Sequence, residues 1–237
     1  MNIELKTLKE SMQAQVTRSE VLANNLANIN STGYKRDAVF LEVLNQKKGS
    51  RTNIQSRIDF SQGNIRETNN PLDLAISGKG FFVVDQDGEE IYTRNGRFNV
   101  DEEGFLITTG GQKVLGSRGW INLTTEKEYT GQITINQVGE IYSGKQLIDR
   151  LRIVDFPDYQ ELKKIAGNAF RTPPANTPVE VQKPTVLQGR LEESNVQAAD
   201  EMITMIEVER QFESYQKVIK ILDHAWDKTV NNIGRFR

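Results

Sequence analysis

The sequence predicts an α+β fold in which long N- and C-terminal helices pack as a coiled coil and an antiparallel β domain is inserted between them. Apolar residues recur at steps of three and four at both ends of the chain, which is typical of helices with one apolar face. Short apolar runs separated by turn residues fill the middle. Four of the six prolines lie from Pro173 to Pro184, where a regular helix is excluded.

The first predicted helix covers residues 3–29. Its apolar seam consists of Leu5, Leu8, Met12, Leu22, Leu26 and Ile29. Gln15 and Ser19 occupy the seam positions between Met12 and Leu22, so the apolar pattern is interrupted in the middle of the helix.

The last predicted helix runs from about Asp200 to Ile233, and neither Pro nor Gly occurs between Leu191 and its end. Its seam follows the a and d positions of a heptad without a break. The seam residues are Met205, Val208, Phe212, Tyr215, Ile219, Leu222, Trp226, Thr229 and Ile233. Such a helix is roughly 50 Å long at 1.5 Å per residue, which is longer than a small domain requires.

Hairpins are expected between the two helices. Phe81–Val84 precedes the turn residues Asp85–Gly88, and Ile91–Thr93 precedes Asn95-Gly96. Further strands are expected at 98–100, 105–108, 132–137, 140–143 and 149–155. The sequence therefore divides into an N-terminal helix with an Asn-rich motif (1–35), an extended linker (36–70), an antiparallel β domain (71–170), a Pro-rich extended return segment (171–190) and a C-terminal coiled-coil helix (191–237).

Composition excludes several classes of function. A net charge of −2 gives no basic field for nucleic acid, and no run of about 18 apolar residues could span a membrane. The N-terminus does not follow the pattern of a cleaved secretory signal. Without Cys, and with His224 as the single histidine on the outer face of the last helix, the sequence predicts no catalytic residues, no metal site and no cofactor.

Two polar motifs flank the helices. Ala23–Lys35 contains four Asn residues and ends near Gly33, which is typical either of a helix end capped by a left-handed Gly or of amides that pair with a neighbouring element. Ser194 and Asn195 are candidate N-caps of the last helix. The adjacent carboxylates Glu192 and Glu193 are interpreted as part of a charged surface.

Three sequence blocks together resemble the flagellar rod and hook protein family. The first is the Asn-rich signature Ala23–Lys35, and the second combines Leu72–Val83 with Tyr92–Phe98. The third block combines Leu191–Val196 with Met205–Glu213. The resemblance implies a non-enzymatic structural subunit of the flagellar basal-body rod in the periplasmic space, surrounding the export channel and transmitting torque. It also implies that the partners are copies of the chain itself, other rod proteins and the flagellar type III export apparatus. Finally, it implies export without a cleaved signal peptide.

An uncovered helical seam needs partners, so we expect the seam residues of both helices to form the assembly interface. To the apolar seam we add the amides of Asn24, Asn25, Asn28 and Asn30. Non-closing contacts between subunits would generate an open helical rod.

Alternatives remain within and outside the family. The segment Phe40–Asn70 is short and lacks the Gly-rich stretch expected of distal rod proteins, and the residues from Asp227 to Phe236 look more like a proximal one. A different class is an enzyme or glycan-binding β domain with a coiled-coil oligomerisation helix, which predicts a convergent polar pocket within residues 72–170. A cytoplasmic coiled-coil scaffold is a further alternative, and it predicts stable terminal helices in isolation.

Overall fold

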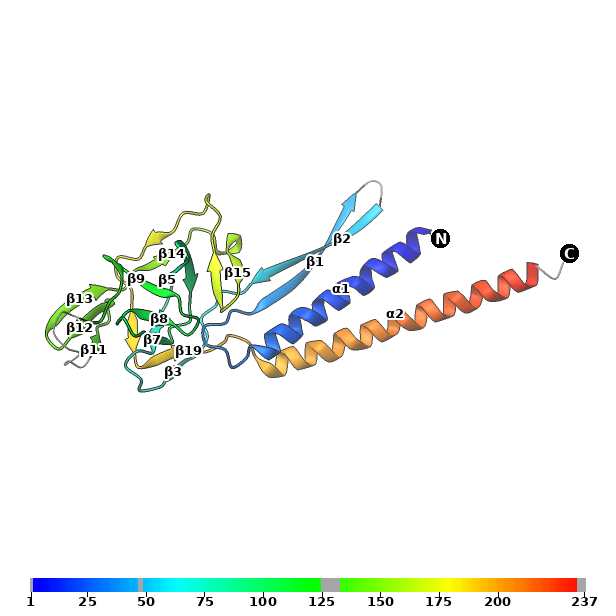
Figure 1. The fold of residues 1–237 in the computed structure, drawn as a ribbon. Coiled ribbons are helices and arrows are strands. Elements are labelled where there is room, and N and C mark those ends of the chain that lie inside the picture. Colours follow the sequence, from blue (N-terminus) through cyan, green and yellow to red (C-terminus); the bar gives the residue numbers. More distant parts are fainter. Residues whose placement is uncertain (1, 47–48, 125–132, 234–237) are drawn as a thin grey trace. The chain divides into compact units, whose positions relative to one another are not determined.

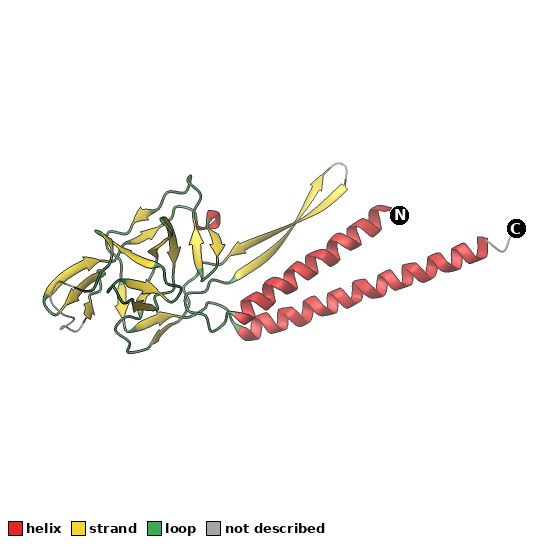
Figure 2. Cartoon of the chain, viewed as in Figure 1, coloured by secondary structure: helices red, strands yellow, loops and turns green. Residues whose placement is uncertain are grey.

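The computed structural model describes residues 2–46, 49–124 and 133–233, and within them it separates two compact units. The helical unit comprises residues up to 27, residues 37–57 and residues from 197 onward. The β unit comprises residues 28–36 and 58–196. Figure 2 shows that helices dominate the helical unit and that strands dominate the β unit. The predicted α+β class is confirmed, with antiparallel strands throughout the β unit.

Two long helices form most of the helical unit. Helix α1 spans Asn2–Ala27 and helix α2 spans Ala198–Ile233, close to the predicted limits. They run antiparallel and side by side, as Figure 1 shows, and Gln15 on α1 contacts Gln211 on α2. No helix within the described ranges is long and apolar enough to cross a membrane.

Strands β1 (Asp37–Gln46) and β2 (Gly49–Ile58) pair as a two-stranded sheet in the region expected to be an extended linker. The chain is extended there, but it folds back on itself. Residues 45–57 are mostly polar, so they carry too weak an apolar alternation to indicate a strand from sequence.

The β unit is built on a ten-stranded sheet with the order β15-β16-β6-β5-β9-β8-β7. Off this path, β10 pairs with β9, and β14 pairs with both β5 and β17. Its strands are β5 (Phe81–Gln86), β6 (Glu89–Thr93), β7 (Phe98–Val100), β8 (Leu106–Thr108), β9 (Lys113–Gly116), β10 (Gly119–Trp120), β14 (Ile153–Asp155), β15 (Lys163–Ile165), β16 (Ala169–Arg171) and β17 (Val179–Glu180). A short 3₁₀ helix spans Tyr159–Glu161.

Three smaller sheets complete the β unit. They are formed by β11 (Ile133–Ile135) with β12 (Glu140–Ser143) and β13 (Gln146–Arg150), by β4 (Leu74–Ile76) with β18 (Val186–Gln188), and by β3 (Ile65–Glu67) with β19 (Arg190–Glu192). The Pro-rich segment thus returns through an extended path, and β18 and β19 pair with strands from the start of the β unit.

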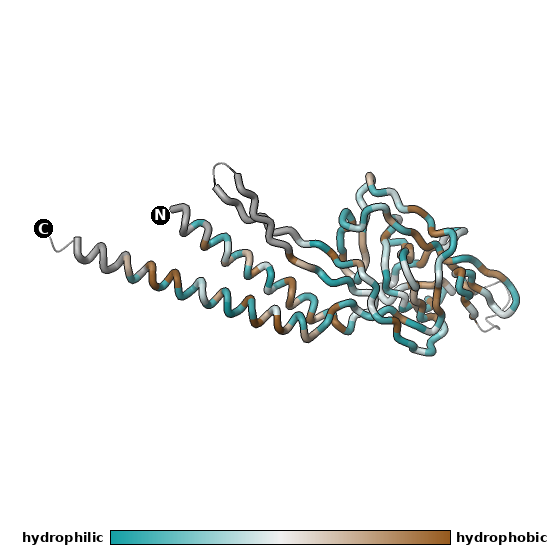
Figure 3. Tube along the Cα trace, turned by 180° about the vertical axis from the view of Figure 1, so that it is seen from behind, coloured by the Kyte–Doolittle hydropathy of each residue, from teal (hydrophilic) through white to brown (hydrophobic). Residues whose placement is uncertain are grey.

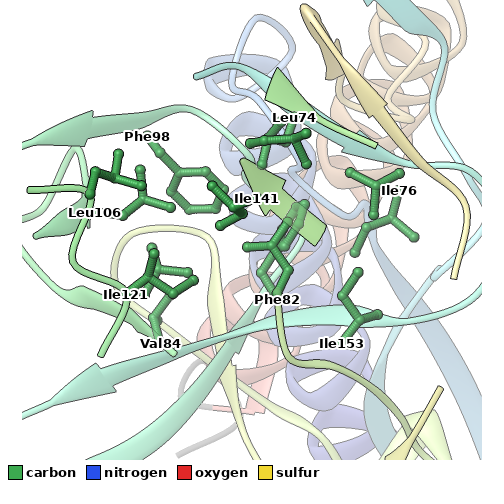
Figure 4. Close-up of a cluster of buried hydrophobic side chains, with 14 of the residues drawn as sticks. Leu74, Ile76, Phe82, Val84, Phe98, Leu106, Ile121, Ile141 and Ile153 are labelled. Atoms are coloured by element: carbon green, nitrogen blue, oxygen red, sulfur yellow. The ribbon is translucent and has the colours of Figure 1, made fainter. Parts of the chain in front are cut away.

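Strand β5 lies between two apolar clusters because both of its faces are buried. Phe82 and Val84 join the larger cluster, which Figure 4 shows together with Leu74, Phe98, Ile121 and other side chains. Phe81 and Val83 face the smaller, aromatic cluster. Full burial of such a side chain stabilises the fold by about 1.5–3 kcal/mol. This explains why the run Phe81–Val84 lacks the apolar and polar alternation of a half-exposed strand.

The predicted turn after β5 is confirmed. Asp87 and Gly88 have φ values of 56° and 86°, the left-handed pair required by a two-residue type I′ hairpin. The sequence Gly78-Lys79-Gly80 leads directly into β5. It is therefore a turn rather than a phosphate-binding loop, because no helix follows it.

Candidate assembly interface

The predicted seams of α1 and α2 are partly covered within the helical unit. Leu22 and Val208 are buried. The other seam residues whose side chains are described are half-buried: Leu8, Met12, Leu26, Met205, Phe212, Tyr215, Ile219 and Leu222. Ile29 is also half-buried but belongs to the β unit. The side chains of Leu5, Trp226, Thr229 and Ile233 lie outside the described set.

A groove of ≈490 Å³ follows the line between the two helices. Val16, Ala23 and Phe212 contribute apolar surface, while Glu20 and Glu209 supply charges. Figure 3 shows apolar residues recurring along both helices. The groove has the amphipathic composition that suits another helix.

Gln15 lies buried in this groove with only 5% of its surface exposed. Its amide nitrogen donates to Oε1 of Gln211 over 2.9 Å. Its own Oε1 has no hydrogen-bond partner among the described residues. The groove therefore contains an unsatisfied buried acceptor, which is a costly feature.

Helix α2 also carries apolar side chains away from its seam, which the heptad pattern does not predict. They are Met202, Ile203, Ile206, Val218 and Ile221, which are 45–67% exposed. We call this set the second apolar stripe. Met202, Ile203 and Ile206 lie within about one helical turn, and Val218 and Ile221 are three residues apart, but twelve positions separate the two groups. The sequence therefore shows no continuous periodicity for them beside the heptad seam.

Asn25 connects three elements of the helical unit and is fully buried. Its amide nitrogen donates to the carbonyl oxygen of Asp37 over 2.8 Å and to Oε2 of Glu201 over 3.2 Å. Its amide oxygen accepts from the backbone N–H of Asp37 over 3.0 Å. Asn25 thus links α1, β1 and α2 of the same chain.

The other Asn residues of the motif lie in different surroundings. Asn24 is exposed on α1. Asn28 belongs to the β unit, where its Oδ1 accepts from the hydroxyl of Ser31 over 3.0 Å. Exposed Asn30 lines a polar cleft of ≈410 Å³ in the β unit together with Arg66.

Lys35, Arg94 and Glu192 form a buried charge triad in the β unit, each no more than 5% exposed. Lys35 Nζ donates to Glu192 Oε1 over 2.6 Å and to the carbonyl oxygen of Ser61 over 2.7 Å. Arg94 donates to Glu192 Oε2 over 3.3 Å and to the carbonyl oxygen of Gly78 over 2.8 Å. One carboxylate therefore holds two cations.

Burial lowers the pKa of Lys35, and the attraction of the Glu192 carboxylate opposes that shift. Burial likewise lowers the pKa of Arg94, and the attraction of the Glu192 carboxylate again opposes the shift. The interpretation of Glu192 and Glu193 as a charged surface is wrong for Glu192, because this side chain is enclosed by the three sequence blocks. Glu193 is at the surface and pairs with Arg66 over 2.9 Å.

Gly33 fits between two of these blocks. Its φ is 66°, and a Cβ atom there would lie 2.5 Å from the backbone of both Arg94 and Asn95. Its N–H donates to the carbonyl oxygen of Glu192 over 2.8 Å. Gly33 is thus required by a close backbone approach as well as by the left-handed conformation.

Asn195 is not an N-cap of α2, which begins three residues later at Ala198. Its Oδ1 accepts from the backbone N–H of Arg36 over 2.8 Å. Its amide nitrogen donates to the carbonyl oxygens of Asp59 and Ser61 over 2.9 and 3.1 Å. This side chain therefore holds together segments of the β unit that are distant in sequence.

His224 is exposed on α2, as its position outside the seam predicts. Within the part of the chain that the structure describes, no group of three His, Asp or Glu residues is placed to hold a metal ion.

Three protein-family models match the chain in the order of the three sequence blocks. Flagella basal body rod protein matches residues 5–35, the flagellar hook protein FlgE/F/G D1 domain matches 75–143, and the flagellar basal body rod FlgEFG protein C-terminal model matches 187–233. The flagellar basal-body rod protein FlgF of Caulobacter vibrioides is 31% identical over 226 residues, covering 91% of each chain. The chain belongs to the flagellar basal-body rod protein family.

Relatives named FlgG have sequence identities to this chain similar to that of the FlgF relative. Flagellar basal-body rod protein FlgG of Agrobacterium fabrum is 35% identical over 90% of this chain and 92% of the relative. FlgG of Borreliella burgdorferi is 32% identical over 98% of each. This chain is accordingly a structural subunit of the flagellar rod, and its family is not enzymatic, which confirms the prediction made from the sequence blocks.

Proposed function

We propose that this rod subunit polymerises through α1 and α2, which pack with each other and with helices of neighbouring subunits as a coiled coil. The groove of ≈490 Å³ between the two helices is the observation that carries the proposal. A neighbouring helix with an apolar ridge fills this groove, and polar side chains on its flanks meet Glu20 and Glu209.

The unsatisfied Oε1 of Gln15 supports a partner at this position. A buried acceptor without a donor costs about 1–3 kcal/mol. A donor on the incoming helix removes that cost only when it arrives at the level of Gln15. The same contact therefore favours one register of the neighbouring subunit.

The second apolar stripe supports further contacts on α2. Five large apolar side chains at 45–67% exposure are unfavourable in water unless another surface covers them. Because the groove and the stripe are different surfaces, contacts between them are heterologous and generate an open helical assembly when the rotation does not close.

The proposed interface retains the seam residues of both helices, including Leu5, Trp226 and Ile233, and the exposed amides of Asn24 and Asn30. Asn25 has a supporting role in it, because its amide connects α1 to β1 and α2. Asn28 supports the interface from the β unit through its contact with Ser31.

The proposed assembly is an inner tube of helices that surrounds the export channel in the periplasmic part of the basal body and transmits torque. The subunit reaches it through the flagellar type III export apparatus without cleavage of a signal peptide. Its partners are copies of itself and other rod proteins.

Within the rod we assign the chain to the proximal, FlgF-like position. The short segment between the Asn-rich motif and the central block supports this, as does the FlgF relative that matches 91% of the chain. The distal, FlgG-like position is the alternative, favoured by the FlgG relative of 35% identity. Complementation of strains that lack either FlgF or FlgG tests the assignment, since only the corresponding strain should regain motility.

Charge substitutions at the proposed contacts test the interface itself. Val16→Glu in the groove and Ile206→Glu in the second stripe change side chains that are 44% and 50% exposed, so the monomer should fold normally. Val179→Glu on the β unit, where Val179 is 59% exposed, is the matched control. Both helix variants should lose motility and rod formation while the control keeps them. Normal rods from both helix variants would exclude this interface.

A further inference from the structure

A polar cleft of ≈400 Å³ lies in the β unit between two tight turns. One turn is Asp87-Gly88 between β5 and β6, and the other contains Gly110 and Gly111 between β8 and β9. Trp120 on β10 forms part of the cleft wall. We call this feature the turn cleft, and all of its residues belong to the β unit.

Strand register brings the main side chains of the turn cleft to one face of the sheet. Asp85 on β5 is directly opposite Lys113 on β9, and Trp120 on β10 is opposite Leu115 on β9. Lys113 and Leu115 are two residues apart, so they point to the same side of the strand. Asp85, Lys113 and Trp120 therefore share a face, and the buried pair Val84 and Val114 points the other way.

Trp120 is 52% exposed and yet held in a defined orientation. Its indole N–H donates to Asp85 Oδ2 over 2.8 Å. Its ring meets Phe105 edge to face at 6.1 Å, and Lys113 Nζ lies 4.6 Å from its centroid. An ordered aromatic side chain with half of its surface in water is a ready contact surface for a ligand.

The rest of the cleft offers both hydrogen-bond donors and acceptors. Asp85 Oδ1 accepts from the N–H of Gly88 over 2.9 Å, and each carboxylate oxygen keeps a further lone pair. Oε1 of Gln112 accepts from the hydroxyl of Thr108, which leaves its amide nitrogen as a donor. Gln86 adds a second amide. A ligand rich in hydroxyl groups, each of which both donates and accepts, matches this lining.

Charge limits the class of ligand. Asp85 and Asp87 against Lys113 give the lining a formal charge of −1, which disfavours an anion. A basic side chain stacked on Trp120 would meet the ammonium of Lys113, which already lies against this ring and 3.9 Å from the centroid of Phe105. The ligand that fits is neutral.

We propose that the turn cleft binds a neutral β-linked oligosaccharide, with one pyranose ring stacked on Trp120 and its hydroxyls bonded to Asp85 and to the amides of Gln86 and Gln112. β-Linked sugars of the gluco series present flat C–H faces and equatorial hydroxyls, which suit an indole wall beside polar side chains. The proposal does not depend on how subunits assemble, because the turn cleft shares no residue with the proposed assembly interface.

Titration of the ¹⁵N-labelled full chain, as a dilute monomer, with cellotetraose and chitotetraose tests the proposal by nuclear magnetic resonance. Maltotetraose and a tetrapeptide of lysine and arginine serve as comparison probes. A β-linked sugar should give saturable shifts of the Trp120 indole and of the Gly88, Gly110 and Gly111 amides. Trp120→Ala should abolish them, and Trp120→Tyr, which keeps a ring but loses the indole N–H, should weaken them. Leu147→Ala, at an exposed site outside the cleft, should leave them unchanged.

Three results would overturn the proposal. One is the absence of saturable shifts with both β-linked sugars at millimolar concentration. Another is binding that survives Trp120→Ala in a variant whose spectrum stays dispersed. The third is a response to the basic tetrapeptide alone, which would indicate a cationic protein partner. If Trp120→Ala fails to fold, the other two variants decide: the proposal requires weaker sugar binding by Trp120→Tyr than by Leu147→Ala.

Discussion

Lys35 Nζ lies 2.6 Å from Glu192 Oε1, and the side chains of both residues are 1% exposed. The two residues come from the first and last sequence blocks, and Arg94 of the central block completes the triad. The three blocks that place the chain in its family are therefore also the three segments that meet in one buried network of the β unit.

Glu192→Gln should destabilise the β unit far more than Glu193→Gln. The first change leaves Lys35 and Arg94 buried without a compensating charge, at a cost of about 3–5 kcal/mol. The second removes an exposed pair with Arg66, which should cost less than about 1 kcal/mol. Urea unfolding of the two variants measures the difference, and equal losses would show that the triad contributes nothing beyond a surface pair.

Gly33→Ala should destabilise the β unit more than Gly144→Ala. Both glycines have similar φ values, 66° and 61°, so the backbone strain of the left-handed region, about 1–2 kcal/mol, is common to both changes. Only at Gly33 does a Cβ atom also lie 2.5 Å from backbone atoms, whereas nothing lies within 4 Å at Gly144. Thermal unfolding midpoints provide the comparison. Similar shifts for the two variants would show that the close approach to Arg94 and Asn95 relaxes without cost.

Asn25→Leu should destabilise the helical unit and impair rod formation, while the β unit stays folded. The change removes three hydrogen bonds that the fully buried Asn25 amide makes with Asp37 and Glu201, and each such bond contributes about 0.5–1.5 kcal/mol. Gln13→Leu changes an exposed side chain on the same helix to a residue of similar helix propensity and should leave helix stability unchanged. Far-UV circular dichroism during heating, together with motility, tests both variants. If the helices of both variants melted at the same temperature, the proposed role of Asn25 would be refuted.

Tyr92 should make the β unit sensitive to alkali. Burial and then the nearby Glu90 carboxylate raise the pKa of its hydroxyl from 10.0 to about 12. Between these values the unfolded chain loses the proton first, so stability is present below about pH 10 and falls as the pH rises toward 12. Tyr92→Phe should make the urea midpoint fall less steeply over this window. Parallel falls in the two proteins would contradict the raised pKa.

Sequence periodicity predicted the two helices because a long amphipathic helix leaves a regular pattern. Helices α1 and α2 lie close to their expected limits, and the turn at Asp87-Gly88 was predicted because only a few residue types adopt positive φ. These features depend on neighbours within the sequence. Local physical rules are sufficient for them.

Long-range contacts were not predictable in the same way. Nothing in the residues around Glu192 indicates that Lys35, 157 positions earlier, will enclose it. The pairing of β1 with β2 was missed because β2 is mostly polar and carries little apolar alternation. The turn cleft depends on the register between Asp85 and Lys113, which the sequence does not specify.

Hydrogen exchange of α1 and α2 in the dilute monomer and in assembled basal bodies tests the proposed interface most directly. Helical amides flanking the groove, around Val16 and Phe212, should exchange rapidly in the monomer and become strongly protected in the rod, whereas amides of the β5 core should be protected in both. Helices already fully protected in the monomer, with no further gain in the rod, would contradict assembly through α1 and α2.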